Sequence, residues 1–291
     1  MPFSSYCLAL LVVIIWAYNN IAVKMGVGEI PPMFLITLRF LVVAILVVPF
    51  TRIKRDQIKT LVLLAFTFGF IHFAFLFTGL SYANAGISAI LVQLGTPFAI
   101  IMACFLLKEP LKMKQIVGIV ISFIGIVVLS GSPEMPSVKA IILLLISAMG
   151  WALTNIIVKK QATQIAPLTL TGWLSLFAIP IVGLASFIFE SNQFESIQQA
   201  TWKGWNAVLF SAIASSIVAY SIWYWLLRKY PINSVVPFSL LSPVFAVFFG
   251  AFMLGESLDG AKLVGALLVV AGIFFAIIDI KALLSKRRRA I

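Results

Sequence analysis

Charged side chains are scarce in this sequence. Only 10% of its 291 residues are charged, 62% are hydrophobic, and the mean hydropathy is +1.13. Soluble globular domains carry about 25% charged residues, so this composition excludes an ordinary soluble domain. The sequence therefore predicts a protein that lies in a lipid bilayer.

Acidic residues are especially few, and none lies in the middle of an apolar run. Proton- and sodium-coupled carriers commonly place a carboxylate at mid-membrane, where burial tunes its protonation and its charge binds a cation. This sequence offers no such group. The nine acids are Glu29, Asp56, Glu109, Glu134, Glu190, Glu195, Glu256, Asp259 and Asp279.

One histidine and two cysteines leave little from which to build a catalytic centre. Cys7 and Cys104 both lie in apolar runs and form no metal-binding or redox spacing. A membrane hydrolase or transferase would need a nucleophile with a base, or a metal cluster. We therefore expect no enzyme, no cofactor and no metal site.

Apolar runs of about 20 residues are what the sequence has in abundance, and this length crosses roughly 30 Å of hydrocarbon. They predict an all-α integral membrane protein with ten transmembrane helices. The N-terminal MPFSSY has no basic region and no cleavage site, so we expect the first run to be retained. The ten runs are Ser5–Val23, Met33–Phe50, Ile58–Leu80, Gly86–Leu107, Gln115–Gly131, Val138–Val158, Leu168–Phe189, Gly204–Leu227, Ser234–Leu254 and Ala261–Leu284.

Lysine and arginine gather at alternate ends of these runs. Sixteen of the 21 lie on the side that holds both termini, four lie on the opposite side, and Arg39 lies within a run. Loops rich in these residues stay in the cytoplasm, so both termini are predicted to be cytoplasmic. Membrane insertion thus accounts for the net charge of +12, and we expect no nucleic-acid partner.

The chain repeats itself. WAYNNIAVK at residues 16–24 returns as WALTNIIVK at residues 151–159. This repeat predicts a five-helix unit at residues 1–132, a second at 137–285, and a basic cytoplasmic tail at 286–291. Because five is odd, the second unit begins on the opposite face of the membrane, and the repeats are inverted. Inverted repeats permit alternating access around a site near the midplane.

Each copy of the motif places one polar and aromatic stripe on a helix, at about 100° per residue. Unpaired amides cost several kcal/mol in hydrocarbon, so the stripes must face protein or a water-filled cavity. One interpretation is a shared substrate site; the other is hydrogen bonding that ties helices together. The stripes are Trp16, Asn19, Asn20 and Val23, and Trp151, Thr154, Asn155 and Val158.

Basic side chains and a histidine within the runs or at their ends are further candidates for substrate binding, proton coupling or gating. Arg39 would favour a substrate carboxylate, or would serve the structure by bonding helix carbonyls. His72 could couple transport to protons or simply pack. Lys24 and Lys159 end the two motif helices, where they complement helix dipoles or act as a gate.

The fourth and ninth runs each combine polar residues with a proline that removes a backbone hydrogen bond. Gln93 and Ser239 are candidate binding residues there, and Pro97 and Pro243 are candidate hinges or ordinary kinks. In the eighth run, a shared face makes two aromatic residues candidates for substrate contact. These are Tyr220 and Trp223.

A second match aligns the stretch from Leu106 with that from Met253. It pairs Glu109 with Glu256, both of which we expect to cap helices. It also pairs glycines whose spacing permits close helix contact, either within the chain or between protomers. The sequence is therefore compatible with both a monomer and a homodimer. These glycines are Gly118, Gly125, Gly265 and Gly272.

The order of these motifs over ten runs resembles the EamA group of the drug/metabolite transporter superfamily. The likeness rests on the two tryptophan–asparagine–lysine motifs, PPMFLITLRF, HFAFLFTGLSYANAGISAILVQLGTPF, KEPL and SPVFAVFFGAFMLGESL. It is similar in particular to bacterial exporters of cysteine and O-acetylserine.

That resemblance implies a protein of the bacterial cytoplasmic (inner) membrane that exports small amino-acid-like metabolites. Its expected partners are a small-molecule substrate and the lipid bilayer. Carriers of nucleotide sugars, purines or S-adenosylmethionine from the same superfamily are the alternative. A membrane enzyme and a structural or receptor-like membrane protein are more remote alternatives, and the latter gives no reason for matched polar stripes.

Overall fold

A computed structural model of the chain describes residues 1–80, 82, 90–130, 137–254 and 259–277. Within these ranges every regular element is a helix and none is a strand. Seven helices are long and apolar enough to cross a membrane: Phe3–Gly26, Pro32–Phe50, Arg55–Leu80, Val138–Gln161, Pro167–Phe189, Trp202–Lys229 and Ile232–Met253. Three shorter apolar helices are Ile90–Leu106, Met113–Leu129 and Gly260–Ala276.

Every apolar run expected from the sequence overlaps one of these helices. The expected ends Gly86, Gly131 and Leu284 lie outside the described residues, as does the tail 286–291. The all-helical class is confirmed, and the three short helices are those whose expected ends fall outside the described part of the chain.

Several of the long helices are built from more than one element. The elements of the first half are α1 (Phe3–Gly26), α2 (Pro32–Val47), η1 (Val48–Phe50), η2 (Arg55–Gln57), α3 (Ile58–Leu64), η3 (Ala65–Ala74), α4 (Phe75–Leu80), α6 (Gly95–Leu106) and α7 (Met113–Leu129). In the second half they are α8 (Val138–Gln161), α9 (Pro167–Phe189), α10 (Gln193–Gln199), α11 (Trp202–Phe210), η4 (Ser211–Tyr220), α12 (Ser221–Lys229), α13 (Ile232–Val235), η5 (Val236–Leu241), α14 (Ser242–Leu254) and α15 (Gly260–Ile277).

Local chemistry explains how these helices begin and how they carry polar side chains. α2 and α9 start at Pro32 and Pro167, where the missing N–H costs no helical hydrogen bond. Along α9, the hydroxyls of Thr171 and Ser175 donate to the carbonyls four residues earlier. Hydroxyl groups are therefore satisfied within their own helix, which suits an apolar surrounding.

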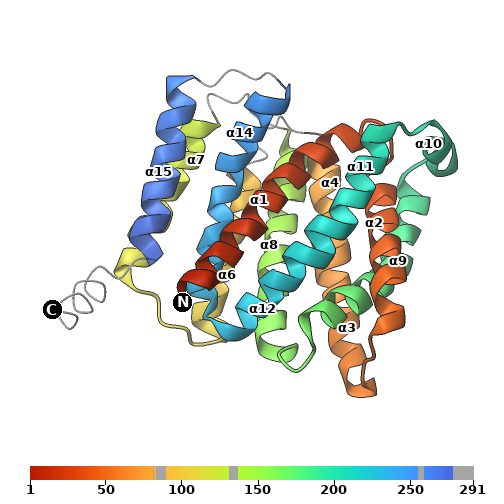
Figure 1. The fold of residues 1–291 in the computed structure, drawn as a ribbon, viewed down its shortest axis with the longest axis horizontal. Coiled ribbons are helices and arrows are strands. Elements are labelled where there is room, and N and C mark those ends of the chain that lie inside the picture. The colour runs from red at the N-terminus through yellow and green to blue at the C-terminus, as the bar shows by residue number, and fades with distance from the viewer. Residues whose placement is uncertain (81, 83–89, 131–136, 255–258, 278–291) are drawn as a thin grey trace.

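The two halves of the chain pack reciprocally. α1 packs against α14, α11 and η4 of the second half, and α8 packs against α6, α4 and η3 of the first. α2 pairs with α9, and α7 pairs with α15, at opposite ends of the molecule (Figure 1). Exchanging the halves turns the contacts of α1 into those of α8 and maps the pairs α2–α9 and α7–α15 onto themselves, which is the pattern of an approximate two-fold relation.

The glycines aligned by the sequence repeat meet where α7 crosses α15. A Cβ added at Gly125 would lie 2.8 Å from the carbonyl oxygen of Gly265, and Gly118 faces Gly272 in the same way. Only helices without side chains at these positions approach so closely. The contact that these glycines permit thus lies within one chain, between its two halves.

Two loop carboxylates cap helices of the opposite half. Glu29 accepts hydrogen bonds from the hydroxyl of Thr201 at 2.6 Å, and from the backbone N–H groups of Thr201 and Gly204 at 2.9 Å, at the start of α11. The hydrogen bond from the Thr201 side chain is the main cause of a lowered pKa of Glu29. Glu190 caps α2 through the N–H of Met33 at 2.7 Å.

Glu109 is also a cap, but of a different helix from the expected one. Its carboxylate accepts hydrogen bonds from the N–H groups of Ile232 at 3.0 Å and Asn233 at 3.1 Å, at the start of α13. The sequence placed it before α7, yet folding brings it to an N-terminus of the second half. Glu256 lies outside the described residues.

Candidate functional site

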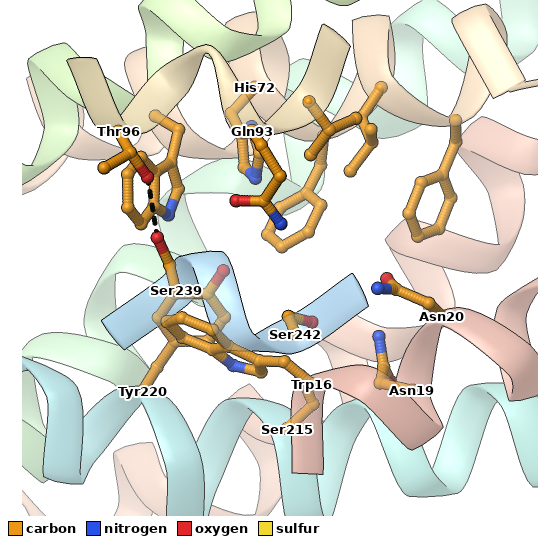
Figure 2. Close-up of a pocket in the computed structure, with 15 residues that line it drawn as sticks. Trp16, Asn19, Asn20, His72, Gln93, Thr96, Ser215, Tyr220, Ser239 and Ser242 are labelled. Carbon is orange, nitrogen blue, oxygen red and sulfur yellow. Dashed lines mark hydrogen bonds between the residues drawn. The ribbon is translucent and has the colours of Figure 1, made fainter. Parts of the chain in front are cut away.

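A cavity lies between the two halves, beside the middle of α1 and α8 (Figure 2). Its volume is about 90 Å³, and no aspartate, glutamate, lysine or arginine is found among its described lining residues. The lining is aromatic, polar and aliphatic. It consists of Trp16, Asn19, Asn20, His72, Phe73, Leu76, Phe77, Val92, Gln93, Thr96, Trp151, Ser215, Tyr220, Ser239 and Ser242.

Polar groups face one another across this cavity. His72 and Gln93 lie on one side, opposite Trp16 and Ser242 (Figure 2). At one end of the view the hydroxyls of Thr96 and Ser239 lie 2.8 Å apart and form a hydrogen bond between the two halves. Asn19 and Asn20 lie toward the other end (Figure 2). The arrangement can bind a small solute through amides, hydroxyls and aromatic faces.

Two π-helices contribute residues to the wall of the cavity. η3 and η4 occupy corresponding places in the third long helix of each half. The first contributes His72 and Phe73 to the cavity, and the second contributes Ser215 and Tyr220. π-Helical turns are rare and often occur at functional sites. They also shift the side chains that follow away from the positions expected of an α-helix.

The imidazole of His72 is held by the second half of the chain. Nδ1 lies 3.1 Å from the carbonyl oxygen of Ser147 and 3.0 Å from its hydroxyl oxygen. A carbonyl only accepts, so the first contact requires the proton on Nδ1. A neutral His72 then keeps Nε2 as an acceptor, and the ring is fixed in the wall of the cavity.

Both candidate hinge prolines of the fourth and ninth runs adjoin a break in their helices. The helix that holds Pro97 is interrupted at Leu94, and Pro243 follows the 3₁₀ segment η5. A proline lacks the N–H that would bond to the carbonyl four residues before it, which explains both irregularities. Gln93 and Ser239 line the cavity from these irregular segments.

The first copy of the duplicated motif faces the cavity. Trp16, Asn19 and Asn20 all line it, and Asn20 is exposed. The side-chain oxygen of Asn19 accepts a hydrogen bond of 2.7 Å from the Ser211 hydroxyl. In this copy the side-chain amide of Asn20 is therefore accessible from the cavity, whereas Asn19 is hydrogen-bonded to Ser211 of η4.

The second copy is placed differently. Of its stripe only Trp151 lines the cavity. Thr154 donates a hydrogen bond of 3.1 Å to Thr67, and Asn155 accepts one of 2.8 Å from the indole N–H of Trp223. These side chains are buried and tie helices together, which is the second of the two interpretations that the sequence left open.

Trp223 and Arg39 lie just behind the cavity wall. The Trp223 side chain has no exposed surface, and its ring centroid is 4.9 Å from that of Trp16. Arg39 is likewise fully buried, with Nε donating to the Ser216 hydroxyl at 2.7 Å. Neither residue lines the cavity itself, whereas Tyr220 from the same face as Trp223 does.

The two lysines that end the motif helices differ in their surroundings. Lys159 donates hydrogen bonds to the carbonyls of Leu227 at 2.8 Å and Tyr230 at 2.9 Å, at the carboxyl end of α12. Lys24 is exposed. Neither lysine lines the cavity.

Comparison with known proteins decides the family. The description "EamA-like transporter family" matches residues 3–131 and again residues 138–278. The chain belongs to the EamA-like transporter family. It is therefore a transporter and a multi-pass membrane protein, as the resemblance of its motifs predicted.

Named relatives of this EamA-family chain cover almost its whole length. A "Probable amino-acid metabolite efflux pump" of Salmonella typhimurium is 33% identical and covers 92% of both chains. One of the same name from Escherichia coli is 31% identical and covers 94% of this chain and 95% of its own. A solved crystal structure shares the fold, with a TM-score of 0.77 at 17% identity over 99% of both chains.

Several lining residues of this EamA-family cavity escaped the sequence-based choice. Phe73 and Phe77 lie in a phenylalanine-rich run, and the aliphatic residues Leu76 and Val92 resemble their apolar neighbours, so none stands out by composition. Ser215, Thr96 and Ser242 are polar residues within apolar runs, and the last two lie next to a hinge proline, so they carried a usable signal.

A metal centre finds no support within the described residues. Among them no group of three or more histidine, cysteine, aspartate or glutamate side chains is positioned to hold an ion.

Proposed function

We propose that this EamA-family protein is a secondary transporter that exports small amino-acid-like metabolites, such as cysteine or O-acetylserine, across the bacterial cytoplasmic membrane. The observation that carries the proposal is the cavity between two reciprocally packed halves, lined by amides, hydroxyls and aromatic rings. The names of the two efflux-pump relatives support the same substrate class.

The size of the cavity supports a small solute. A single water needs roughly 10–15 Å³, so the 90 Å³ of this open-sided cavity holds on the order of six to nine such volumes. Cysteine and O-acetylserine are of this size, whereas a nucleotide sugar is several times larger.

Nucleotide-like solutes are the second candidate, and one feature favours them. Trp16, Phe73, Phe77, Trp151 and Tyr220 bring several aromatic rings to the cavity, and such rings stack well on nucleobases. A carrier of that kind would need a wider cavity in its loaded state. The small volume therefore supports amino-acid-like solutes over nucleotide-like ones.

The proposed topology is ten transmembrane helices in two inverted repeats with both termini in the cytoplasm. The excess of lysine and arginine at alternate ends of the apolar runs supports the orientation. The reciprocal packing of α1 with α14 and of α8 with α6 supports the inverted relation. An active cytoplasmic reporter fused after Ile291 is expected; a periplasmic readout would contradict this topology.

The two motif copies support a state that is open to the outside. In the first copy Asn20 and Lys24 are exposed, whereas in the second Asn155 is 2% exposed and Lys159 bonds to the end of α12. In the proposed topology Lys24 lies at the outer end of its helix. Alternating access requires the two ends to exchange these environments during transport.

Counterflow in proteoliposomes tests the function. Vesicles are loaded with cysteine, O-acetylserine, threonine or a nucleotide sugar, with and without a pH gradient. Saturable exchange of the small amino acids is expected to be weakened in Asn20→Ala but retained in a Lys203→Gln control, at an exposed position in the first turn of α11. Exchange of nucleotide-like solutes alone would replace the proposed substrate class, and no exchange of any solute would refute the proposal.

A further inference from the structure

Arg39 carries a positive charge that the protein does not neutralise. Its side chain has no exposed surface, and its only side-chain hydrogen bond among the described residues joins Nε to Ser216. Nη1 and Nη2 are buried and have no hydrogen-bond partner in the described part of the chain. No described aspartate or glutamate pairs with it. Nη1 and Nη2 of the guanidinium therefore carry four N–H groups that make no hydrogen bond within the described residues.

Aromatic rings separate this charge from the cavity. Arg39 Cζ lies 4.3 Å from the centroid of the Phe73 ring and 5.9 Å from that of Tyr220. Both rings line the cavity, and they come from the two π-helices η3 and η4. One aromatic layer thus stands between the guanidinium and a bound solute.

A buried, unpaired guanidinium costs several kcal/mol, which cation–π contacts and one hydroxyl offset only in part. A carboxylate is the ligand that best matches two adjacent guanidinium nitrogens, through two parallel hydrogen bonds. We propose that Arg39 is the anion subsite of the cavity and selects substrates that bear a carboxylate. The inference rests on the proposed function, since it names the charge of the transported amino acid.

The attraction does not require the aromatic layer to move. A carboxylate in van der Waals contact with the cavity face of Phe73 lies about 8 Å from the guanidinium, given the 4.3 Å on the other face. At an effective dielectric constant of about 20, this distance favours the carboxylate by about 30-fold in affinity. Parting of Phe73 and Tyr220 would add direct hydrogen bonds to this preference.

The test compares cysteine with cysteine amide, which keeps the size but replaces the carboxylate with a neutral group. Half-saturating concentrations for both are measured by competition in counterflow. In the wild type the amide is expected to need at least roughly 30 times more solute than cysteine. In Arg39→Gln this ratio is expected to fall close to one, whereas Ser216→Ala, which leaves the charge in place, keeps it.

A further variant and the wild-type result distinguish failure of the anion subsite from failure of the proposed function. Arg39→Met also removes the charge, and it replaces Arg39→Gln as the neutral variant where Arg39→Gln does not fold. A ratio near one in the wild type, or an unchanged ratio in the folded neutral variant, would overturn the anion subsite while the proposed function stands. Failure of the wild type to exchange any amino acid would refute the proposed function instead.

Discussion

Asn20 and Asn155 occupy matching places in the duplicated motif, and the structure predicts opposite consequences of replacing them. Asn155→Ala removes the acceptor of a 2.8 Å hydrogen bond from Trp223, whose side chain has no exposed surface. The indole N–H is then left buried without a partner, which costs about 1–3 kcal/mol. Alanine regains up to about 0.7 kcal/mol in helix propensity, so a net loss of about 0.3–2.3 kcal/mol is expected.

Asn20→Ala should leave stability almost unchanged. Asn20 is exposed, and surface replacements usually change the free energy of unfolding by less than about 0.5 kcal/mol. Its effect should appear instead as a raised half-saturating concentration in transport, because it lines the cavity. The matched pair thus separates a residue that holds the fold from one that faces the solute.

Denaturant titration in detergent measures both stabilities, and counterflow normalised to folded protein measures transport. A double-mutant cycle with Trp223→Phe isolates the hydrogen bond: in that background Asn155→Ala should lose most of its cost. Equal stabilities for Asn20→Ala and Asn155→Ala, or an unchanged cost of Asn155→Ala beside Trp223→Phe, would refute the reasoning.

Three further predictions follow from other parts of the fold. Gly125→Leu should lower stability in a denaturant titration by about 1–3 kcal/mol or more, because even a Cβ there meets α15 at 2.6 Å, whereas Gly28→Ala meets nothing closer than 3.6 Å and should be neutral. Stability from the lowered pKa of Glu29 is present above its unfolded value near 4.5 and is lost as pH falls through the folded one. Thermal melts below pH 5 should therefore fall more steeply in the wild type than in Glu29→Gln, and parallel curves would contradict this. Lys159→Met should raise labelling of cysteines introduced at the cytoplasmic end by a water-soluble thiol reagent, and Lys24→Met should not.

Much of the fold could be predicted from the sequence because long apolar runs have a simple cause. Each run reports the free energy of transferring about 20 residues into hydrocarbon, which depends on composition and little on neighbours. The ten runs accordingly overlap the described helices. The helix that Glu109 caps was harder to predict, because Glu109 precedes α7 in the sequence but lies at the start of α13, next to Ile232, in the fold.

The candidate site could be predicted only in part. Trp16, Asn20 and Gln93 were found because polar groups within apolar runs are conspicuous. Phe73 was missed because phenylalanine in an apolar run carries no such signal, although it lies in the π-helix η3 and lines the cavity. Asn155 shows the reverse case: it is conspicuous in sequence but bonded to another helix.

Local features of the sequence were enough to establish that this chain is helical, lies in a membrane and is built from two related halves. These features are hydropathy, the charge at helix ends and the recurrence of a motif. Which copy of the motif faces the cavity, and that Arg39 lies behind Phe73 without a charged partner among the described residues, followed from the packing of the helices alone. Hydrogen bonds and aromatic contacts act over a few ångströms, so their partners are fixed by how helices pack and not by the order of residues along the chain.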